Sequence, residues 1–273
     1  GAETAGSPKY GSFSHIETSN CGSGIHAGLT PGNIGAGIDV ASASGWTVSD
    51  CVDYASFVGF ILDTGAGAQC QFSNLVAWYT QHDGSNPTNG SGYGFYVGSS
   101  DSSFTNCSSI LSEYRGWWID APGNDFDGCM TYVPQREGVL IKAGQNSIEM
   151  RVKGAGAAAA NTYDAVIIDS SQAAITELEL TLSTTGTNHR YGVNASGANA
   201  IGARVRGSVT GTTGKVNRGS YGISTELMDT ATGRMSYNKD AAGFDFDYAG
   251  KMRITAAAAN SDYMAAAFGD SAN

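Results

Sequence analysis

Short apolar runs recur along the chain, each about four residues long and separated from the next by Gly, Ser, Asn and Thr. Apolar residues at alternate positions are typical of strands with one buried face. The runs follow one another at an average interval of about 26 residues, within the range of solenoid repeats. They are Phe60–Asp63, Phe95–Gly98, Trp117–Asp120, Val139–Lys142 and Val166–Asp169, with Ile38, Val193 and Ile223 as single anchors beyond them.

A second column of apolar runs follows the first. Val97, Ile119, Ile141 and Ile168 each lie seven positions before a second-column residue, which predicts that both columns stack in register. Third residues of the second column are Asp, Asn or Gly in four units, and these types tolerate left-handed backbone angles. The pattern therefore predicts a single-residue bend at Asp50, Asn74, Asn106 and Gly128, relaxed in the later units that carry Met150, Glu177 and Ala203 instead. Second-column runs begin at Val48, Phe72, Phe104, Phe126, Ile148, Ile175 and Ile201.

These columns and bends resemble the right-handed parallel β-helix of the pectate-lyase-like class, whose rungs are three short strands with a ladder of asparagines at one bend. The resemblance covers Ile38 to Ile223. A β-sandwich would not hold a fixed register over eight units, and a propeller blade needs four strands in about 40 residues. We therefore expect an all-β fold with a cap or partial rung at 1–35, a parallel β-helix at 36–225, and a cap or trimerisation segment at 226–273. In that last segment Phe244 to Tyr248 alternates apolar and acidic residues.

The amino-acid composition limits the kinds of partner that the chain can bind. The 15 basic and 25 acidic residues give a net charge of −10, which argues against nucleic acid because phosphate binding draws on clustered Lys and Arg. The sequence has neither 18 consecutive apolar residues nor a basic start followed by an apolar run, so we expect no membrane span and no signal peptide. Neither the five cysteines nor the four histidines have metal-ligand spacing, and we expect no cofactor. Cys107 and Cys129 share a column and are expected to be reduced and buried.

Because side chains alternate along a strand, the first column also predicts outward stripes. One stripe is apolar, and a soluble monomer would not normally expose so large a patch. Three interpretations stay open: a covering loop, an interface between copies, or an aromatic platform for sugar rings at Tyr96 and Trp118. Trp117 points inward and is expected in the core. The apolar stripe is Ile61, Tyr96, Trp118, Leu140, Ile167 and Gly192, and a second is Asp63, Gly98, Asp120, Lys142, Asp169 and Asn194.

A third stripe is the richest in polar residues. Glu137 and Asp164 occupy neighbouring rungs, where mutual repulsion would favour one protonated carboxyl group, the acid that glycoside cleavage needs. Asp120 and Asp169 are two rungs apart, nearer the separation that admits an attacking water. The alternative is a solvated charge ladder in which Arg115 to Glu137 and Asp120 to Lys142 are ordinary surface pairs. The stripe is Tyr93, Arg115, Glu137, Asp164 and His189, flanked by Tyr114, Arg136, Tyr163 and Asn188.

A low-charge β-helix with an apolar stripe and an unpartnered tail strand resembles a bacteriophage tailspike or tail-fibre receptor-binding protein. The resemblance implies a homotrimer, on the virion or otherwise extracellular, that binds and hydrolyses a bacterial surface polysaccharide, the missing start of the chain being the virion-attachment part. The expected catalytic pair is Glu137 with Asp164, and Asp120 with Asp169 is the second choice. The residues expected to hold sugar are Tyr96, Trp118, Tyr114, Arg115 and His189.

Two other functions stay open. The same stripes would serve a non-catalytic receptor-binding spike or adhesin that only binds or trimerises. A secreted polysaccharide lyase would need a basic residue beside a calcium-binding cluster of carboxylates, for which Asp125 and Asp127 with Arg151 are the candidates.

Overall fold

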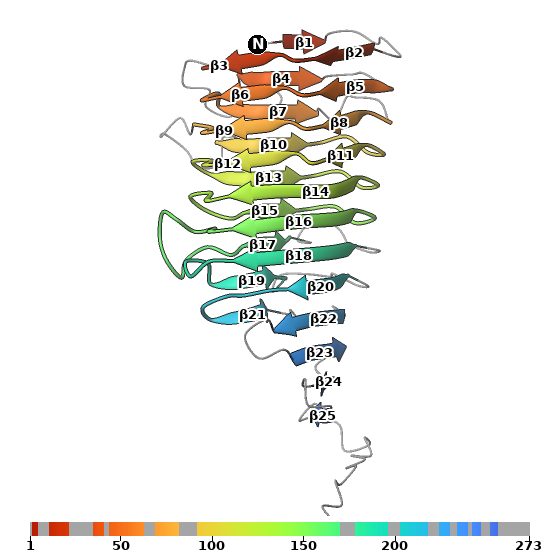
Figure 1. The fold of residues 1–273 in the computed structure, drawn as a ribbon, viewed down its shortest axis with the longest axis vertical. Coiled ribbons are helices and arrows are strands. Elements are labelled where there is room, and N and C mark those ends of the chain that lie inside the picture. The colour runs from red at the N-terminus through yellow and green to blue at the C-terminus, as the bar shows by residue number, and fades with distance from the viewer. Residues whose placement is uncertain are drawn as a thin grey trace, which may run out of the picture.

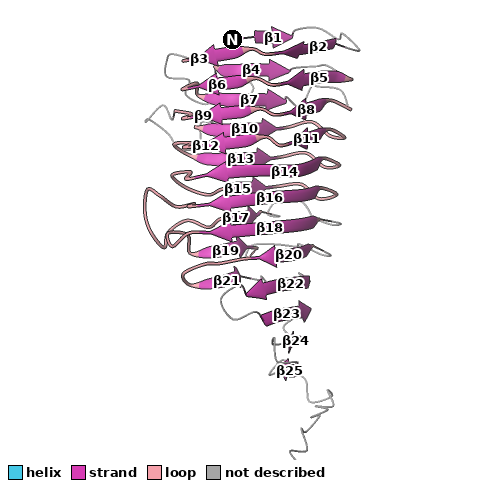
Figure 2. Ribbon diagram, viewed as in Figure 1, coloured by secondary structure: helices cyan, strands magenta, loops and turns pink. Residues whose placement is uncertain are grey.

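A computed structural model describes residues 2–4, 11–21, 35–40, 44–62, 69–81, 92–169, 178–195, 203–217, 224–229, 234–239, 242–246 and 252–255. This part of the chain folds into 25 strands and contains no helix (Figure 2). It therefore offers no helix that could cross a membrane. The all-β prediction is confirmed.

Nine strands form one sheet, called sheet A here, and each pairs in parallel with its neighbours. Five of its nine strands have glycine as their second residue, followed by an apolar or aromatic residue, a composition suited to burial on both faces. In sheet order the strands are β1 (Ala2–Thr4), β4 (Ala36–Val40), β7 (Val58–Leu62), β10 (Tyr93–Val97), β13 (Arg115–Ile119), β15 (Val139–Ile141), β17 (Val166–Ile168), β19 (Tyr191–Asn194) and β21 (Gly214–Asn217).

Sixteen strands form sheet B, which has two limbs in its first rungs. The main limb is β2 (Gly11–Ser14), β5 (Trp46–Ser49), β8 (Gln71–Ser73), β11 (Ser103–Thr105), β14 (Asp125–Tyr132), β16 (Ser147–Lys153), β18 (Glu179–Thr185), β20 (Arg204–Ser208), β22 (Ser224–Asp229), β23 (Arg234–Lys239), β24 (Ala242–Phe246) and β25 (Met252–Thr255). The side limb is β3 (Glu17–Ser19), β6 (Val52–Tyr54), β9 (Val76–Trp78) and β12 (Ser108–Ile110), and it joins the main limb at β14.

The chain visits both sheets once in every turn. From β7 in sheet A it passes to β8 and β9 in sheet B and returns to sheet A as β10, which pairs with β7 (Figure 1). Adjacent parallel strands lie about 4.8 Å apart, so each turn advances the coil by that distance. This order of strands is compatible with a parallel β-helix or a similar solenoid.

The predicted bends are confirmed. Asp50, Asn74, Asn106 and Gly128 all have left-handed backbone angles, with φ of 52°, 54°, 54° and 62°. The backbone amides of Asp50, Asn74 and Asn106 donate to the next rung, as in the 3.0 Å hydrogen bond from Asn74 N to the Thr105 carbonyl oxygen. Asn74 Nδ2 also donates to Asp50. β16 runs through Met150 without a break, so the expected relaxation of the bend is confirmed at that residue.

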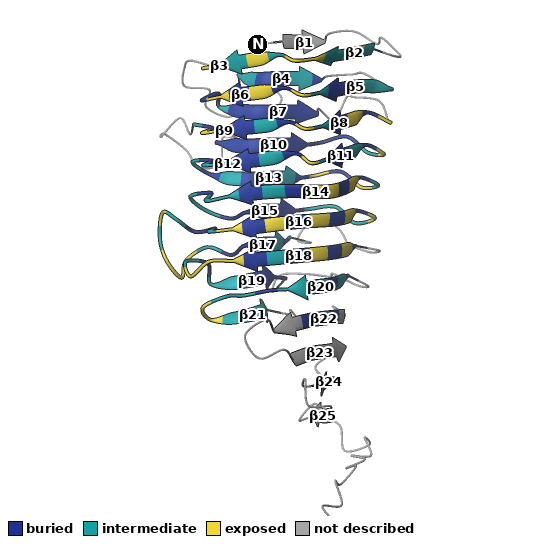
Figure 3. Cartoon of the chain, in the orientation of Figure 1, coloured by how far each residue is buried: buried dark blue, intermediate teal, exposed yellow. Residues whose placement is uncertain are grey.

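Aromatic rings stack along the coil axis inside the core. The Phe95 ring lies 5.0 Å from Phe60 and 3.9 Å from Trp117, and a second stack joins Phe72, Phe104 and Phe126 at 4.7 and 4.9 Å. Trp117 is fully buried, as predicted, and its indole N–H donates to the Met130 carbonyl. Figure 3 shows buried residues along the strands of both sheets.

A column of glycines narrows the coil where sheet A faces sheet B. A Cβ on Gly116 would collide with the Thr131 side chain and would lie 2.7 Å from the Gly138 carbonyl oxygen. Gly94 faces Ser109 in the same way. These strands need glycine for close approach rather than for an unusual backbone angle. The column is Gly37, Gly59, Gly94, Gly116, Gly138 and Gly192.

Several predicted registers are wrong at the two ends of the repeat. Val193 pairs with Val166 rather than Ile168, Ile38 pairs with Phe60 rather than Leu62, and Leu180 occupies the rung position expected for Ile175. Segments between strands vary in length without disturbing the stacking, so a fixed seven-residue spacing fails where a connection lengthens. Ile175, Glu177, Ile201 and Ile223 lie outside the described residues. In the next rungs Val205 pairs with Leu180, and β21 pairs with β19.

Strands continue on both sides of the central coil. β1, β2 and β3 pair in parallel with β4, β5 and β6, so residues before 35 contribute strands to the two sheets. Beyond β22 the pairing becomes antiparallel through β23, β24 and β25. The alternating run at Phe244 to Phe246 forms part of β24, in agreement with its pattern.

Candidate functional site

Residues from two predicted stripes meet at the carboxyl ends of β10, β13, β15 and β17. The Tyr96 and Trp118 rings pack edge to face at 5.3 Å, and the Tyr96 hydroxyl lies 3.4 Å from Asp120 Oδ2. Lys142 places its ammonium 5.0 Å from the Trp118 ring. Asp169 follows Ile168, two strands from Asp120, so their backbones lie about 10 Å apart. This set is called the carboxylate cluster below.

The geometry around Asp120 depends on a glycine. A Cβ at Gly98 would lie 2.8 Å from the Tyr96 ring, so only glycine lets this ring lie over the strand end and reach Asp120. Asp120 is exposed, but partial desolvation by its neighbours raises the pKa of its carboxyl, with a smaller contribution from Asp169. The Lys142 charge and the Tyr96 and Trp118 side chains oppose that rise, and the net pKa lies above its ordinary value.

The apolar stripe predicted on the outer face of sheet A is mostly buried within this single chain. Ile61, Leu140 and Tyr96 are 1%, 5% and 6% exposed, so they are not open to solvent as a patch. The rings pack on one another instead, with Tyr93 lying 5.1 Å from Trp118 and 5.4 Å from Tyr114. Of the two predicted platform residues, Tyr96 is buried and Trp118 is half-buried. The prediction of an open sugar platform is therefore wrong for Tyr96. The largest exposed apolar side chains of the described residues lie on sheet B and its bend: Val52, Tyr54, Trp78 and Tyr79.

Arg115 and Glu137 form an ion pair, as the charge-ladder interpretation predicts, but the pair is largely buried rather than a solvated surface pair. Arg115 Nε lies 2.7 Å from Glu137 Oε2, and the two side chains are 17% and 9% exposed. The Arg115 guanidinium also lies 4.6 Å from the centre of the Tyr114 ring. Arg115 and Tyr114 therefore lie side by side, as the sequence predicts, with the positive charge of Arg115 balanced by Glu137.

Asp164 is a buried carboxylate with a complete set of donors. Arg190 Nε and Nη2 donate to its two oxygens at 3.0 and 2.8 Å, and the Tyr191 amide and Asn194 Nδ2 add 3.1 and 2.6 Å hydrogen bonds. The side chain is 1% exposed. Arginine side chains thus hold Glu137 and Asp164 separately, an arrangement that ties rungs together and does not present the two carboxylates as a pair to a substrate.

His189 is buried, and its Nε2 donates a 2.8 Å hydrogen bond to the Thr210 carbonyl. Burial lowers the pKa of this imidazole, which favours its neutral form. The position predicted to hold sugar therefore lies inside the coil, where it joins successive rungs. Asp63 lies outside the described residues.

A pocket of about 460 Å³ opens among the connections that lead from sheet B to the amino ends of β13, β15 and β17. Tyr114, Arg136 and Tyr163 from the predicted flanks line it. Tyr79 and Glu113 also line it and were not predicted. Tyr79 lies at a second bend, where its φ of 58° matches 56° at Leu111 and 49° at Val133. Tyr, Leu and Val do not favour left-handed angles, so the residue types gave no signal for this bend. The set Tyr79, Leu111, Glu113, Tyr114, Gln135, Arg136, Ala158 and Tyr163 is called the tyrosine–arginine pocket below.

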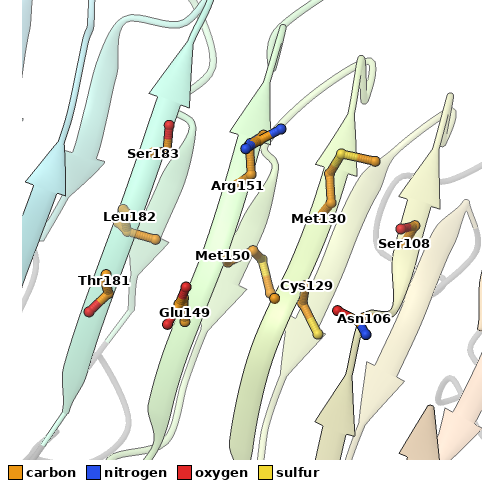
Figure 4. Close-up of a pocket in the computed structure, with 11 residues that line it drawn as sticks. Asn106, Ser108, Cys129, Met130, Glu149, Met150, Arg151, Thr181, Leu182 and Ser183 are labelled. Carbon is orange, nitrogen blue, oxygen red and sulfur yellow. The ribbon is translucent and has the colours of Figure 1, made fainter. Parts of the chain in front are cut away.

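A second hollow of about 400 Å³ lies on the outer face of sheet B, where the bend at Asn106 gives way to the straight strands β16 and β18 (Figure 4). Glu149 and Arg151 project into it from β16, beside Thr181 and Ser183 of β18. The lyase candidates lie on the same sheet, but Arg151 pairs with Met130, three positions along β14 from Asp127. No group of three metal-binding side chains occurs within the described ranges.

Comparison with known proteins adds no relative. No protein family matches the chain. No curated protein matches it, and no solved structure does so either. Arguments about function therefore rest on the carboxylate cluster, the tyrosine–arginine pocket and the fold that positions them.

Proposed function

We propose that this chain is a tailspike-like protein that binds a bacterial surface polysaccharide along the outer face of sheet A and hydrolyses it at the carboxylate cluster. One observation carries the proposal: Asp120 and Asp169 flank Lys142 on three adjacent strands, beside the partly open Trp118 ring. Aromatic faces that pack against sugar rings and a pair of separated carboxylates are the parts a glycosidase needs.

In this proposal Asp120 is the acid. Its raised pKa keeps a fraction of the carboxyl protonated, so it can give a proton to the glycosidic oxygen as the bond to C1 breaks. Asp169 takes a proton from a water that attacks C1 from the opposite face. A separation near 10 Å between the strands leaves room for that water, which favours inversion. Lys142, between the two carboxylates, orients the sugar hydroxyls.

The proposal includes a right-handed parallel β-helix that assembles as a homotrimer, on a virion or otherwise outside the cell. Support comes from the recurring strand order and from Val52, Tyr54 and Trp78, which offer exposed apolar surface for contact between copies. Light scattering tests the assembly: we expect a mass near three times 28.1 kDa. A monomeric mass would reject the trimer and leave the carboxylate cluster to be tested alone.

The hydrolysis test measures reducing ends released from purified surface polysaccharides of candidate hosts. D120N and D169N should each lower the rate at least about a hundredfold, since each removes acid–base catalysis. E149Q changes one carboxylate on the outer face of sheet B and serves as the matched control, with an unchanged rate. Equal rates in D120N and the wild type would reject this assignment of the acid.

A non-catalytic receptor-binding spike is the second candidate. Glu137 and Asp164 favour it, because arginine side chains hold both carboxylates and leave them no evident part in bond cleavage. Tight binding of a surface polysaccharide without release of reducing ends by the wild type would support this function and reject hydrolysis.

A further inference from the structure

The tyrosine–arginine pocket combines aromatic walls with a few converging polar groups, the usual composition of a sugar subsite. Tyr79 stands 41% exposed at its edge, and the Tyr114 and Tyr163 rings lie deeper. Gln135 and Glu113 supply hydrogen-bonding groups. The carboxylate cluster lies at the opposite ends of the same strands, so one extended glycan following sheet A could contact both sites.

Arg136 is the distinctive group in this pocket. Its guanidinium carbon lies 4.2 Å from the centre of the Tyr114 ring and 5.4 Å from that of Tyr163, so two aromatic rings fix its position. Arg115 lies against the same Tyr114 ring, but Glu137 balances the charge of Arg115. None of the ion pairs found in the described segments involves Arg136. A half-buried guanidinium that takes part in none of these ion pairs therefore faces the pocket, which Glu113 also lines.

The pocket is preformed by backbone hydrogen bonds. Arg136 N donates to the Tyr114 carbonyl at 2.9 Å, and Gly156 N donates to the Arg136 carbonyl at 2.7 Å. Ala158 N donates to the Gln135 carbonyl at 2.9 Å, which fixes the wall that the alanine-rich turn contributes. A ligand that enters needs little ordering of the protein, so more of its contact energy appears as affinity.

We propose that this pocket is a non-catalytic subsite for an acidic sugar, whose carboxylate pairs with Arg136 while its ring packs on Tyr79. The inference rests on the proposed binding of polysaccharide and names the class of glycan: one that contains a uronic acid or another carboxylate-bearing sugar. A planar guanidinium held between rings presents paired N–H donors that match a carboxylate. A neutral sugar would offer this guanidinium no charged acceptor for its paired donors.

The test uses immobilised bacterial surface polysaccharides, each as the native polymer and after chemical reduction of its carboxyl groups to alcohols. Reduction removes the negative charge and retains the sugar backbone. We expect wild-type protein to bind an acidic polysaccharide and to lose at least about tenfold in affinity when its carboxyl groups are reduced. R136Q should bind the native polymer with the same weaker affinity as the wild type binds the reduced one. R136K should fall between them, because it keeps the charge but not the paired donors.

R151Q is the matched control, because it removes one exposed arginine charge from the outer face of sheet B. It should bind like the wild type, and circular dichroism and melting curves of all variants establish that they fold. Two results would overturn the acidic subsite and leave the proposed function in place. One is wild-type affinity that stays the same after the carboxyl groups are reduced, and the other is R136Q affinity equal to that of the wild type. Absence of binding to every polymer, acidic or neutral, overturns the proposed function together with the subsite.

Discussion

Arg190 donates two hydrogen bonds, of 3.0 and 2.8 Å, from its Nε and Nη2 atoms to the buried carboxylate of Asp164. The Tyr191 amide and Asn194 complete the shell, so Asp164 joins the β17 rung to the next one. Glu137 has one such contact, with Arg115 at 2.7 Å. The two carboxylates of one stripe thus differ in how much of the fold depends on them.

This difference predicts unequal losses of stability. D164N should lower the free energy of unfolding by about 2–4 kcal/mol, because it disturbs four hydrogen bonds to a buried carboxylate and removes the negative partner of Arg190. E137Q should cost about 1 kcal/mol, because the amide oxygen can still accept from Arg115. Urea unfolding of both variants measures the two losses of unfolding free energy. Equal losses would contradict the structural role given to Asp164.

The glycine column predicts a severe effect from a single methyl group. G116A should destabilise the protein by about 3 kcal/mol, since the new Cβ would overlap Thr131 and the neighbouring backbone. At Gly214 the nearest atoms to an added Cβ are on the Tyr191 ring, at 3.3 and 3.4 Å. G214A is therefore the control, with a loss below about 1 kcal/mol. Thermal melting of the two variants compares them, and a G116A protein as stable as G214A would refute the close approach of the sheets.

Because of the buried carboxyl group of Asp53, we expect the free energy of unfolding to fall as the pH rises. It is fully buried, accepts hydrogen bonds from Thr18 and Ser56 on Oδ1, and has no partner on Oδ2 among the described residues. Burial raises the pKa of Asp53 to about 6, although both hydroxyl donors lower it. Because the folded state holds this proton more tightly than the unfolded chain, the contribution is fully present below pH 4 and is lost as the pH rises through 6.

D53N isolates this contribution, because its side chain does not titrate. Between pH 4 and pH 7, the difference in unfolding free energy should move in favour of D53N by about 2 kcal/mol. Denaturant titrations at several pH values measure it. A difference that stays constant with pH would show that Asp53 does not carry a raised pKa.

The hydrogen bond from Tyr96 to Asp120 is expected to affect how hydrolysis depends on pH. The Tyr96 hydroxyl lowers the pKa of Asp120, so Y96F should raise it. If Asp120 acts as the acid, activity falls as the pH rises through this pKa, and Y96F should move the falling limb to higher pH. Profiles of kcat/KM against pH test this, with E149Q as the control that leaves the limb in place. A limb that moves to lower pH would argue against Asp120 as the acid.

Much of the coil could be predicted from the sequence, because its stacked positions repeat residue types. The bends at Asn74 and Asn106 and the inward Trp117 follow from backbone tolerance and alternation alone. Register near Val193 could not be predicted, because connections change length without changing the stack. Neither could the burial of Tyr96, which depends on packing between rings of different strands, nor Arg190 as the partner of Asp164, which depends on side-chain reach across rungs.

Binding of a surface polysaccharide to W118A and W78A tests the central claim most directly. Trp118 lies beside the carboxylate cluster, whereas Trp78 is exposed on sheet B, so the two variants remove the same ring from different faces. We predict that W118A loses at least about tenfold in affinity, the loss expected for one aromatic–sugar contact, and that W78A, compared at the same oligomeric mass by light scattering, binds like the wild type. Unchanged binding by a folded W118A protein would contradict a polysaccharide site on the outer face of sheet A.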